Sequence, residues 1–518
     1  MTAEADLVFT NAEVHTLTET DETYEAVAVR DGEIVRVDSA YEVEFLTGVE
    51  TEVIDLEGKV LLPGFIDAHT HLETSGKYFV HADLSGVGSI DEAVETLRNE
   101  AREEGWMLGF GWDESDWPEN RYLRREDLDR VSEERPVAAM RVDMHTATLN
   151  SVALDRLAEE LPKEEVHYED GRPTGVVVED AVGVVFEDVG ESPEDTRELL
   201  EAARDRCQEL GITGVHEKIR DSHAPRVYRE LEKEGELGLR VRIDYWSDHL
   251  DAVLETGLRS NHGSGLVEVG GIKTFTDGSF GGRTAKLTEP YADIDPTEKA
   301  GEDDDGLGQW VVEPDEFRRL VERVDDAGLQ MVTHAIGDVA IDLTVDAYEE
   351  TDAPGEIRHR IEHVELATDE TIERMADLGV VASCQPNFHQ WAQDGGLYDG
   401  RLGTERRTWT NRLRTIKDAG VPLAFGSDSM PLGPLEGIHH AVNAPVESQR
   451  LTVTEALQAY THGAAYAGHD EDRLGTVEVG KRADFVVLDA SPWENEDSIR
   501  EIDVEMTVVD GEIVYDGR

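Results

Sequence analysis

The sequence is poor in cysteine and contains no long apolar run. Its 2 cysteines, Cys207 and Cys384, lie far apart in the chain, which excludes a disulfide framework and a thiolate metal cluster. No stretch reaches the roughly 18 apolar residues that a membrane span needs. The first 30 residues hold several acidic residues and no apolar run of signal-peptide length. We therefore expect a soluble, cytoplasmic protein.

Basic residues are also scarce. The chain has 48 Lys and Arg against 115 Asp and Glu, for a formal net charge of −67, and only 10 of the basic residues are Lys. Binding to nucleic acid or to an anionic membrane surface requires a basic surface, so we expect neither partner. The hydrophobic share of 39%, with 47 Gly and 17 Pro, is too high for a disordered chain. The sequence predicts a folded protein with an acidic surface.

Abundant carboxylates with few lysines are typical of proteins from salt-loving microbes. High ionic strength shortens the electrostatic screening length to ~3 Å at 1 M salt and weakens self-repulsion. We hypothesise a halophilic source and a fold that needs molar salt. The alternative is an acidic protein of ordinary cytosol.

Both ends of the chain alternate apolar and polar residues as half-buried strands do. The pattern lies at 6–10, 26–29, 34–37, 474–477, 483–488, 506–509 and 512–515. The two terminal segments could be separate modules, but neither has enough strands to close a core comfortably alone. We predict that residues 1–60 and 471–518 form the two parts of one β-sandwich.

Between the ends, short apolar runs alternate with helical patterns, such as 192–210 and 314–328, which indicates a parallel sheet. The candidate strands lie at 61–66, 212–216, 240–245, 271–275, 330–334, 359–363, 380–384 and 422–426. Eight strands close a barrel, so we predict an α/β fold with a (β/α)8 TIM-type barrel over 61–470. A subdomain of about 75–205, with a strand-like segment at 137–142, is inserted after the first barrel strand. A doubly wound open sheet is the alternative.

Residues able to bind a metal stand at the carboxyl ends of these strands. His69 and His71 end the first strand, and residues two apart in an extended chain point to the same face, so both imidazoles can reach one ion. Other strands end in His334, His363 and Asp428. A single histidine at a strand end is usually an ordinary residue. Five such side chains at the mouth where barrel enzymes carry their active sites predict a metal site.

Lys273 stands in an otherwise apolar strand, the fourth. An ammonium group beside metal cations would be repelled. The residues alone therefore leave a salt-bridged lysine near the barrel mouth as the alternative to a role in the site.

The sequence resembles the amidohydrolase superfamily, and within it the amidohydrolase-3 branch of YtcJ-like proteins and N-substituted formamide deformylases. The matching motifs lie at 62–71, 272–279, 282–285, 333–338, 360–363, 426–428 and 475–484. Together they cover nearly the whole chain, and they are specific for fold and chemistry rather than for substrate.

The resemblance implies a barrel with a composite β-sandwich and a metal centre holding zinc. His69, His71 and Asp428 would hold one divalent ion, and His334 and His363 the other. Lys273 matches the position that is carboxylated in binuclear relatives, and a carbamate there would be an anionic bidentate ligand, which removes the electrostatic objection. A mononuclear site is the alternative.

A metal ion lowers the pKa of a bound water towards ~7 and polarises a scissile carbonyl. We therefore predict a hydrolase that cleaves a non-peptide C–N bond of a small amide, formamide or cyclic amide with metal-activated hydroxide. Asp428 is the expected general base and acid. The alternatives are a deaminase, an isomerase or decarboxylase on the same scaffold, and a non-catalytic binding or regulatory relative.

Four further residues are candidates for contact with a small-molecule substrate. His145 matches a family position in the inserted subdomain, and Arg283 stands in the glycine-rich loop after the fourth strand, where a surface salt bridge is the alternative. Trp112 and Asp113 are expected to line the pocket, unless Trp112 is a packed core residue. His216 is left outside the metal shell, and a homodimer is expected from the family alone.

Overall fold

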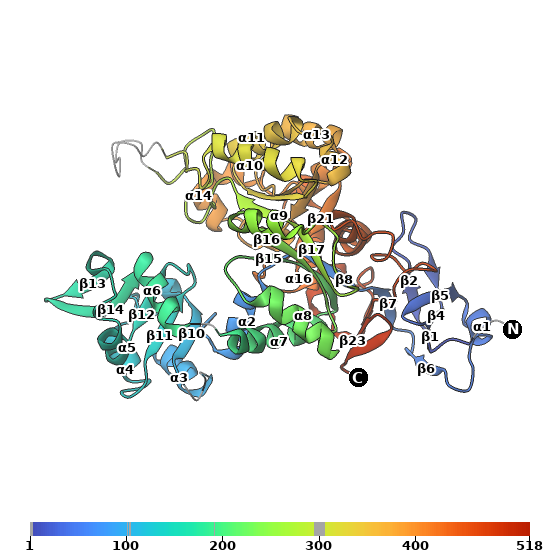
Figure 1. The fold of residues 1–518 in the computed structure, drawn as a ribbon, viewed down its shortest axis with the longest axis horizontal. Coiled ribbons are helices and arrows are strands. Elements are labelled where there is room, and N and C mark those ends of the chain that lie inside the picture. Colours follow the sequence, from blue (N-terminus) through green and yellow to red (C-terminus); the bar gives the residue numbers. More distant parts are fainter. Residues whose placement is uncertain (1–3, 101, 103–104, 191, 295–305) are drawn as a thin grey trace. The chain divides into compact units, whose positions relative to one another are not determined.

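The computed structural model describes residues 4–100, 102, 105–190, 192–294 and 306–518. The chain forms two compact units, one of Met1–His71 with Arg204–Arg518 and the other of Leu72–Ala203. Figure 1 shows both units, coloured along the sequence from blue at the N-terminus to red at the C-terminus. Each unit is described by itself below.

The first unit contains a nearly closed barrel of eight parallel strands in the order β21-β20-β19-β18-β17-β16-β15-β8. Their bounds are β8 (Phe65–Thr70), β15 (Ile212–Ile219), β16 (Arg240–Trp246), β17 (Val267–Phe275), β18 (Met331–Ala335), β19 (Arg360–His363), β20 (Val381–Cys384) and β21 (Leu423–Phe425). The two outer strands meet where they end, because the Asp428 backbone N–H donates to the His69 carbonyl at 2.8 Å. The barrel therefore brings the first and last of the predicted ligands together.

The barrel strands are short runs that are buried on both faces. All eight residues of β15 are buried, as expected for parallel strands covered by helices. All eight predicted strands overlap an observed barrel strand, although 61–66 overlaps β8 only at Phe65 and Ile66. The prediction of one strand over 61–66 was wrong, because the chain divides at Gly64 into β7 (Val60–Pro63), which pairs in another sheet, and β8. A Cβ at Gly64 would lie 2.2 Å from Cγ2 of Thr213, so the crossing leaves room only for glycine.

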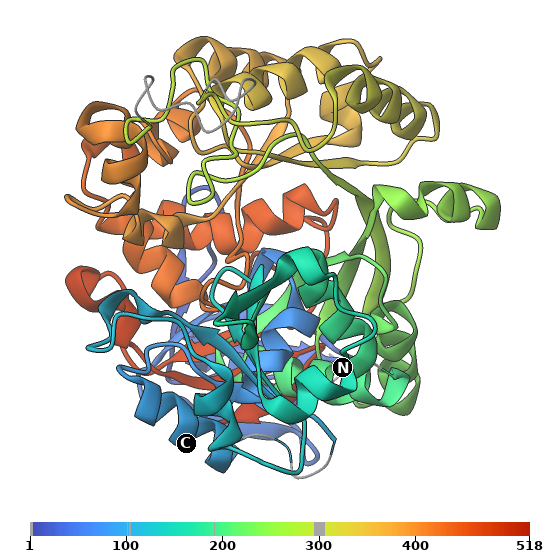
Figure 2. The ribbon, with the colours of Figure 1, turned by 90° about the vertical axis from the view of Figure 1, so that its left-hand side faces the viewer.

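Amphipathic helices cover the barrel. Helix α10 begins with Pro314 in its first turn, followed by Asp315 and Glu316, and buries Phe317, Val321 and Val324 at helical spacing. Figures 1 and 2 show α10, α11 and α13, in yellow and orange, along one side of the strands. The helices after the insert are α7 (Pro193–Glu209), which contains the division between the units, α8 (Ala224–Glu234), α9 (Leu250–Thr256), α10 (Pro314–Asp326), α11 (Asp338–Glu349), α12 (Pro354–Ile357), α13 (Asp369–Leu378), α14 (Leu397–Arg407), α15 (Leu413–Asp418), α16 (Pro434–Val442), α17 (Val453–Gln458) and α18 (Ala464–Ala467).

Two further sheets are ordered β5-β4-β1-β6, from the amino-terminal segment, and β24-β23-β22-β7-β2-β3, which combines strands from both chain ends. They share one apolar core, in which Phe9 packs edge-on against Phe485 with ring centroids 5.8 Å apart. The strand predicted over 474–477 was wrong, because these residues lie outside strands in the structure. The elements are β1 (Leu7–Thr10), β2 (Glu13–His15), β3 (Thr23–Tyr24), β4 (Ala26–Arg30), β5 (Glu33–Asp38), α1 (Ala40–Glu44), β6 (Glu52–Asp55), β22 (Phe485–Leu488), β23 (Val504–Val509) and β24 (Glu512–Asp516).

The second unit is built on a six-stranded sheet in the order β13-β14-β12-β11-β10-β9. Strand β11 alternates its side chains between two cores, with Ala138 and Met140 on one face and Val137 and Ala139 on the other. The elements are α2 (Leu72–Val80), β9 (Ala82–Asp83), α3 (Ile90–Glu100), β10 (Met107–Trp112), α4 (Arg125–Asp129), β11 (Val137–Arg141), β12 (Thr146–Leu149), α5 (Ser151–Arg156), β13 (Val166–Glu169), β14 (Arg172–Val178) and α6 (Asp180–Val189).

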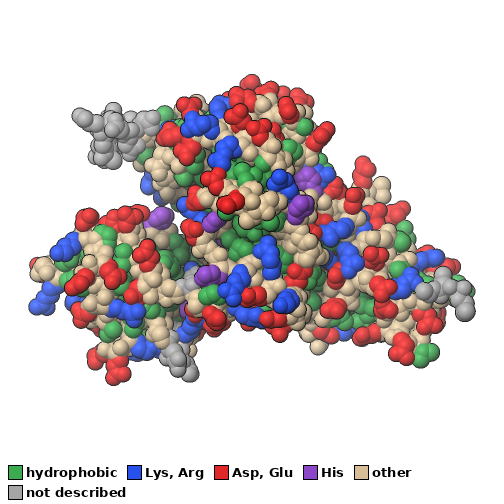
Figure 3. All heavy atoms as spheres, viewed as in Figure 1, with side chains coloured by type: hydrophobic (Ala, Val, Ile, Leu, Met, Phe, Trp, Pro, Cys, Tyr) green, Lys and Arg blue, Asp and Glu red, His purple; other side chains and the backbone are tan. Residues whose placement is uncertain are grey.

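Acidic side chains are spread over the viewed face of the molecule, with Lys and Arg scattered between them (Figure 3). Among the described helices, none combines the length and apolarity needed to cross a lipid bilayer.

Candidate metal centre

Three predicted ligands converge at the carboxyl ends of the barrel strands. The side chains of His69, His363 and Asp428 each offer a ligand atom, and these atoms all lie within 4.8 Å of one another. Oδ1 of Asp428 lies 3.4 Å from Nε2 of His69 and 3.3 Å from Nε2 of His71. The structure therefore places three of the predicted ligands, His69, His71 and His363, around the carboxylate of a fourth, Asp428.

The backbone is strained where these residues stand. His363 and Asp428 have φ angles of 75° and 54°, and the residues that follow them, Val364 and Ser429, also have positive φ. Non-glycine residues adopt this conformation at a cost and keep it only where the surrounding structure imposes it. Such clusters of strain are typical of functional sites.

His334 and Lys273 lie beside this group. The ring centroid of His334 is 4.4 Å from that of His363, and its Nε2 donates to the Gly278 carbonyl at 3.1 Å. Nζ of Lys273 donates to the Thr274 carbonyl at 3.3 Å and lies 4.3 Å from the centre of the Phe275 ring. Both side chains are buried, and both residues stand in the last third of their barrel strands, β17 and β18.

Burial sets the protonation of the imidazoles and of Lys273. It holds the pKa of His69 well below its usual range and lowers the pKa of His363 to about 4. It also lowers the pKa of Lys273 to about 7, although the Glu362 carboxylate acts in the opposite direction. Neutral imidazoles and a partly neutral amine are the forms that bind metal or react with carbon dioxide.

Asp428 is the anionic member of the group. Burial alone would raise the pKa of its carboxyl group, but the neighbouring His69, His71 and His363 rings outweigh burial and hold the pKa below its usual range. Asp428 is therefore an ionised acceptor that faces several imidazole nitrogens.

The donor set fits a divalent cation. Nδ1 of His363 is buried and has no hydrogen-bond partner among the described residues. Imidazole nitrogens with a carboxylate oxygen are the ligands that zinc and related metals prefer. His69, His71, His363 and Asp428 would hold the ion, with His334 and Lys273 near enough to take part.

Two buried residues that sequence reasoning did not assign also contact the site. Oε2 of Glu362 lies 2.5 Å from Nδ1 of His69, and Arg360 donates from Nε to Oε1 of Glu362 at 2.5 Å. Burial alone would raise the pKa of Glu362, but Arg360 and Lys218 outweigh it and lower the pKa to about 2. The sequence feature that could have identified them is a pair of charged residues inside a predicted buried strand that ends in a predicted ligand.

The predicted substrate residues have other surroundings. Arg283 is partly exposed and pairs with Asp293, with Nη2 2.8 Å from Oδ2, which agrees with the surface salt-bridge alternative. His216 is buried in the barrel, where its Nδ1 lies 2.8 Å from Nη1 of Arg360.

The other three candidates belong to the second unit. Trp112 is fully buried and donates from Nε1 to the Ala139 carbonyl at 3.0 Å, as a packed core residue does. Asp113 is exposed and accepts from the Ser115 backbone N–H at 3.0 Å. The His145 side chain is 71% exposed and has Nδ1 3.1 Å from Oε2 of Glu179. Their roles in substrate binding stay predictions.

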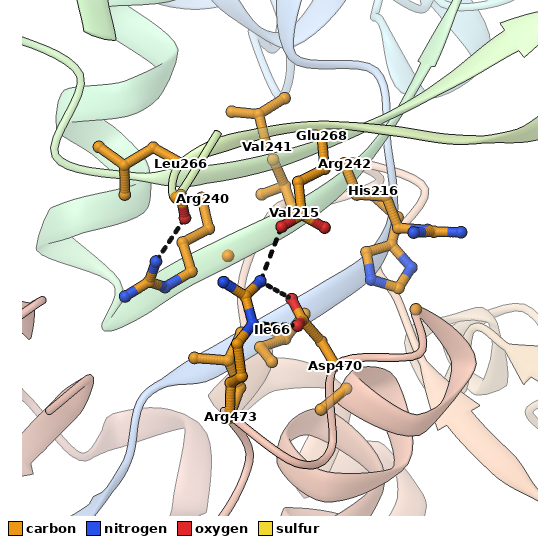
Figure 4. Close-up of a pocket in the computed structure, with 15 residues that line it drawn as sticks. Ile66, Val215, His216, Arg240, Val241, Arg242, Leu266, Glu268, Asp470 and Arg473 are labelled. Carbon is orange, nitrogen blue, oxygen red and sulfur yellow. Dashed lines mark hydrogen bonds and ion pairs between the residues drawn. The ribbon is translucent and has the colours of Figure 1, made fainter. Parts of the chain in front are cut away.

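A small pocket of about 30 Å³ lies at the opposite, amino ends of the strands (Figure 4). There Arg240 forms a double hydrogen bond with Asp484, at 2.6 and 2.9 Å. Arg473 bridges Glu268 and Asp470, each at 2.7 Å. These cations are paired with carboxylates, so this pocket differs in character from the metal centre.

A parallel barrel with clustered imidazoles and a carboxylate at its carboxyl ends defines a metal-dependent hydrolase fold. The model of the amidohydrolase family matches residues 52–515, and the chain belongs to this family.

The relatives agree with this assignment. The chain is 31% identical to the putative amidohydrolase YtcJ of Bacillus subtilis, over 97% of this chain and 98% of the other. It is 28% identical to the N-substituted formamide deformylase of Arthrobacter pascens, over 100% and 99%. The crystal structure of an uncharacterized metal-dependent hydrolase from Pyrococcus furiosus matches with a TM-score of 0.79 and 32% identity, covering 94% of this chain and 99% of that one.

Proposed function

We propose that this metal-dependent hydrolase cleaves a non-peptide C–N bond in a small amide, formamide or cyclic amide. The observation that carries the proposal is the cluster of His69, His363 and Asp428, whose ligand atoms lie within 4.8 Å of one another at the barrel mouth. The similarity to a protein named N-substituted formamide deformylase supports an amide substrate. The proposed ion is zinc.

A bound divalent ion would polarise the carbonyl of the amide and activate water for attack. The protein holds the imidazoles neutral by burial, so they offer lone pairs rather than positive charge to the ion. It also fixes Asp428 against His69 and His71 at 3.4 and 3.3 Å. This fixed arrangement avoids reorganisation during the reaction.

Asp428 is the proposed general base and acid. Its carboxylate is ionised, so it can take a proton from the attacking water. The same group can then give that proton to the departing nitrogen, which leaves as an amine. The proton thus starts and ends outside the protein, and Asp428 returns to its ionised state.

Lys273 is the proposed ligand of a second ion, as a carbamate. A buried lysine whose pKa is lowered to about 7 is partly neutral near neutral pH, and a neutral amine is the form that adds to carbon dioxide. The addition forms an N–C bond, releases one proton from the amine nitrogen to solvent, and leaves an anionic carbamate in place of the amine. If the lysine is unmodified, the site would hold one ion.

The test combines metal analysis with a substrate screen. The protein is purified in high salt, its zinc and manganese content is measured, and N-substituted amides, formamides and cyclic amides are screened for hydrolysis. Asp428→Asn is the matched variant, because it keeps the shape of the side chain and removes its basicity. We expect bound metal in the wild type, turnover of at least one amide, and a loss of about 10²- to 10⁴-fold in the variant.

The outcomes separate the alternatives. Release of ammonia instead of an amine or carboxylate would indicate a deaminase. Unchanged turnover in Asp428→Asn would remove the proposed proton transfer. A metal-free protein, even with excess zinc or manganese, would overturn the proposed hydrolase mechanism.

The surface charge leads to a separate proposal about conditions. With a formal net charge of −67, the acidic residues repel one another at low ionic strength, so we propose that the chain folds fully only in concentrated salt. The same charge disfavours nucleic acid, so the proposed partner is a small molecule. Thermal melts in about 0.1 M and about 3 M KCl test the proposed need for salt. A cooperative melt that is the same in both would contradict it.

A further inference from the structure

Glu362 is a fully buried carboxylate that contacts a predicted metal ligand, His69, on the side of its ring opposite to Asp428. It stands in β19 directly before His363, and its side chain has no exposed surface. Oε2 lies 2.5 Å from Nδ1 of His69, which is the ring nitrogen that does not face Asp428. The carboxylate therefore contacts one ligand through the side of its ring that points away from the predicted ion.

Arg360 holds this carboxylate in place. Its guanidinium donates from Nε to Oε1 of Glu362 at 2.5 Å and from Nη2 to Oε2 at 3.1 Å. The two N–H groups of Nη2 are shared between Glu362, the carbonyl of Ala68 (2.7 Å) and the hydroxyl of Ser383 (2.7 Å), and Nη1 lies 2.8 Å from Nδ1 of His216. The Arg360 guanidinium is rigid and planar, and each of its three nitrogens is hydrogen-bonded. It therefore fixes the position of Glu362 relative to β8, β15 and β20.

This arrangement determines which nitrogen of His69 carries the proton. A carboxylate that accepts hydrogen bonds from a guanidinium on both oxygens has no proton to give. The hydrogen bond between Glu362 and His69 must therefore use an N–H on Nδ1 of His69. In a neutral imidazole that leaves Nε2 as a bare acceptor, and Nε2 is the atom 3.4 Å from Oδ1 of Asp428.

We propose that Glu362, clamped by Arg360, is a positioning residue that holds His69 with Nε2 free and aimed at the metal. The inference rests on the proposed metal site and adds a residue that never touches the ion. Hydrogen bonds of this kind orient ligands in metal sites, and their loss typically weakens metal affinity by about 10- to 100-fold.

The test uses Glu362→Gln with Asp244→Asn as the matched control. Asp244 is also a fully buried carboxylate in the barrel, where it pairs with Nζ of Lys218 at 2.8 Å. It also accepts from the Gly271 backbone N–H at 2.7 Å, and neither Lys218 nor Gly271 is a predicted ligand. Both variants remove one buried charge from a buried ion pair. Metal affinity is measured by competition between the metal-depleted protein and a zinc chelator of known affinity.

We expect zinc affinity to fall by about 10- to 100-fold in Glu362→Gln and to stay within about twofold of the wild type in Asp244→Asn. Equal losses in both would show that Glu362 matters only for packing, and no loss in Glu362→Gln would also overturn the proposal. If the wild type binds no zinc, it is the proposed function that fails.

A second measurement needs no folded Glu362 variant. Nitrogen NMR of metal-free protein labelled in its histidine rings reports which ring nitrogen carries the proton, and the His69 signal is assigned as the one lost in His69→Gln. We expect the proton on Nδ1 of His69. A proton on Nε2 would overturn the proposal even if Glu362→Gln fails to fold.

Discussion

Both ends of the barrel contain buried polar side chains, but these side chains differ in whether they are paired with a group of opposite charge. At the amino ends, Arg240 is paired with Asp484, and Arg473 is paired with Glu268 and Asp470, as Figure 4 shows. At the carboxyl ends, Nδ1 of His363 is buried without a hydrogen-bond partner among the described residues, and Nζ of Lys273 donates to a backbone carbonyl at 3.3 Å and lies over the rings of Trp246 and Phe275 rather than beside a paired carboxylate.

The difference shows how hydrogen-bond pairing decides whether a buried polar residue contributes to stability or to chemistry. A paired group contributes to stability and has little capacity left for chemistry, whereas an unpaired one costs stability and keeps its lone pair or charge available. Substitutions at the amino ends should therefore change stability alone, and substitutions at the carboxyl ends should change metal binding and turnover.

The largest expected effect is at the carboxyl ends. His363→Gln removes an imidazole that lies within 4.8 Å of the ligand atoms of His69 and Asp428. We expect turnover of the best amide to fall by about a thousandfold, which is about 4 kcal/mol of transition-state stabilisation, together with a lower metal content. Steady-state kinetics and metal analysis measure both. Normal turnover would place the reaction away from this cluster.

The next effect is at the amino ends. Asp484→Asn removes the charge that Arg240 binds with two hydrogen bonds, and both side chains are less than 10% exposed. Arg240 then keeps an ion pair with Asp510, whose Oδ1 lies 2.7 Å from Nη2 and whose side chain is 35% exposed, so we expect the free energy of unfolding to fall by about 2 kcal/mol. Urea unfolding measures it. Metal content should not change, and a lower content in the folded variant would contradict the separation between the two ends.

A pH dependence should arise from a second unpaired histidine near the carboxyl ends. His389, in the turn η4 (Pro386–Gln390) that follows β20, is fully buried, and its two ring nitrogens have no hydrogen-bond partner among the described residues. Burial lowers its pKa to about 3, well below about 6.5 in the unfolded chain.

Because the unfolded chain takes up this proton first, His389 lowers stability progressively as the pH falls from about 6.5 towards 3. The slope from this one group is about 1.4 kcal/mol per pH unit at most. We expect His389→Leu to reduce the acid sensitivity by up to that amount, measured by urea unfolding from pH 7 to pH 4. Identical slopes in both proteins would show that His389 has a partner in solution.

The smallest effect should come from Glu268→Gln at the amino ends. Glu268 accepts from Nη2 of Arg473 at 2.7 Å, but Arg473 also binds Asp470 and its side chain is 38% exposed. Exposed pairs contribute about 0–1 kcal/mol, so we expect a loss of less than about 1 kcal/mol in urea unfolding. A loss as large as that of Asp484→Asn would mean that the pocket is a single cooperative network.

Much of the barrel and of the ligand set could be predicted from the sequence. The strand periodicity is local, and the positions of His334, His363 and Asp428 at strand ends follow from it. The division at Gly64 could not be predicted, because residues 61–66 form one apolar run on both sides of the glycine, and only the strands that each side pairs with separate them. The strand predicted over 474–477 failed for the same reason.

Contacts across the barrel were also beyond the sequence. The side chains of Glu362 and His69 are 293 residues apart in the chain and 2.5 Å apart in the structure. Arg283 is in a glycine-rich loop that suggests ligand binding, yet Asp293 takes its guanidinium.

The amino-acid sequence by itself determined that this chain is an acidic, folded α/β protein with histidines and an aspartate at the ends of its parallel strands, because periodicity and residue type are properties of short segments. Only the tertiary structure decided which of those side chains meet, which buried charges are paired, and which nitrogen of His69 faces inward. These depend on closure of the barrel, which sets distances between strands that no local pattern contains.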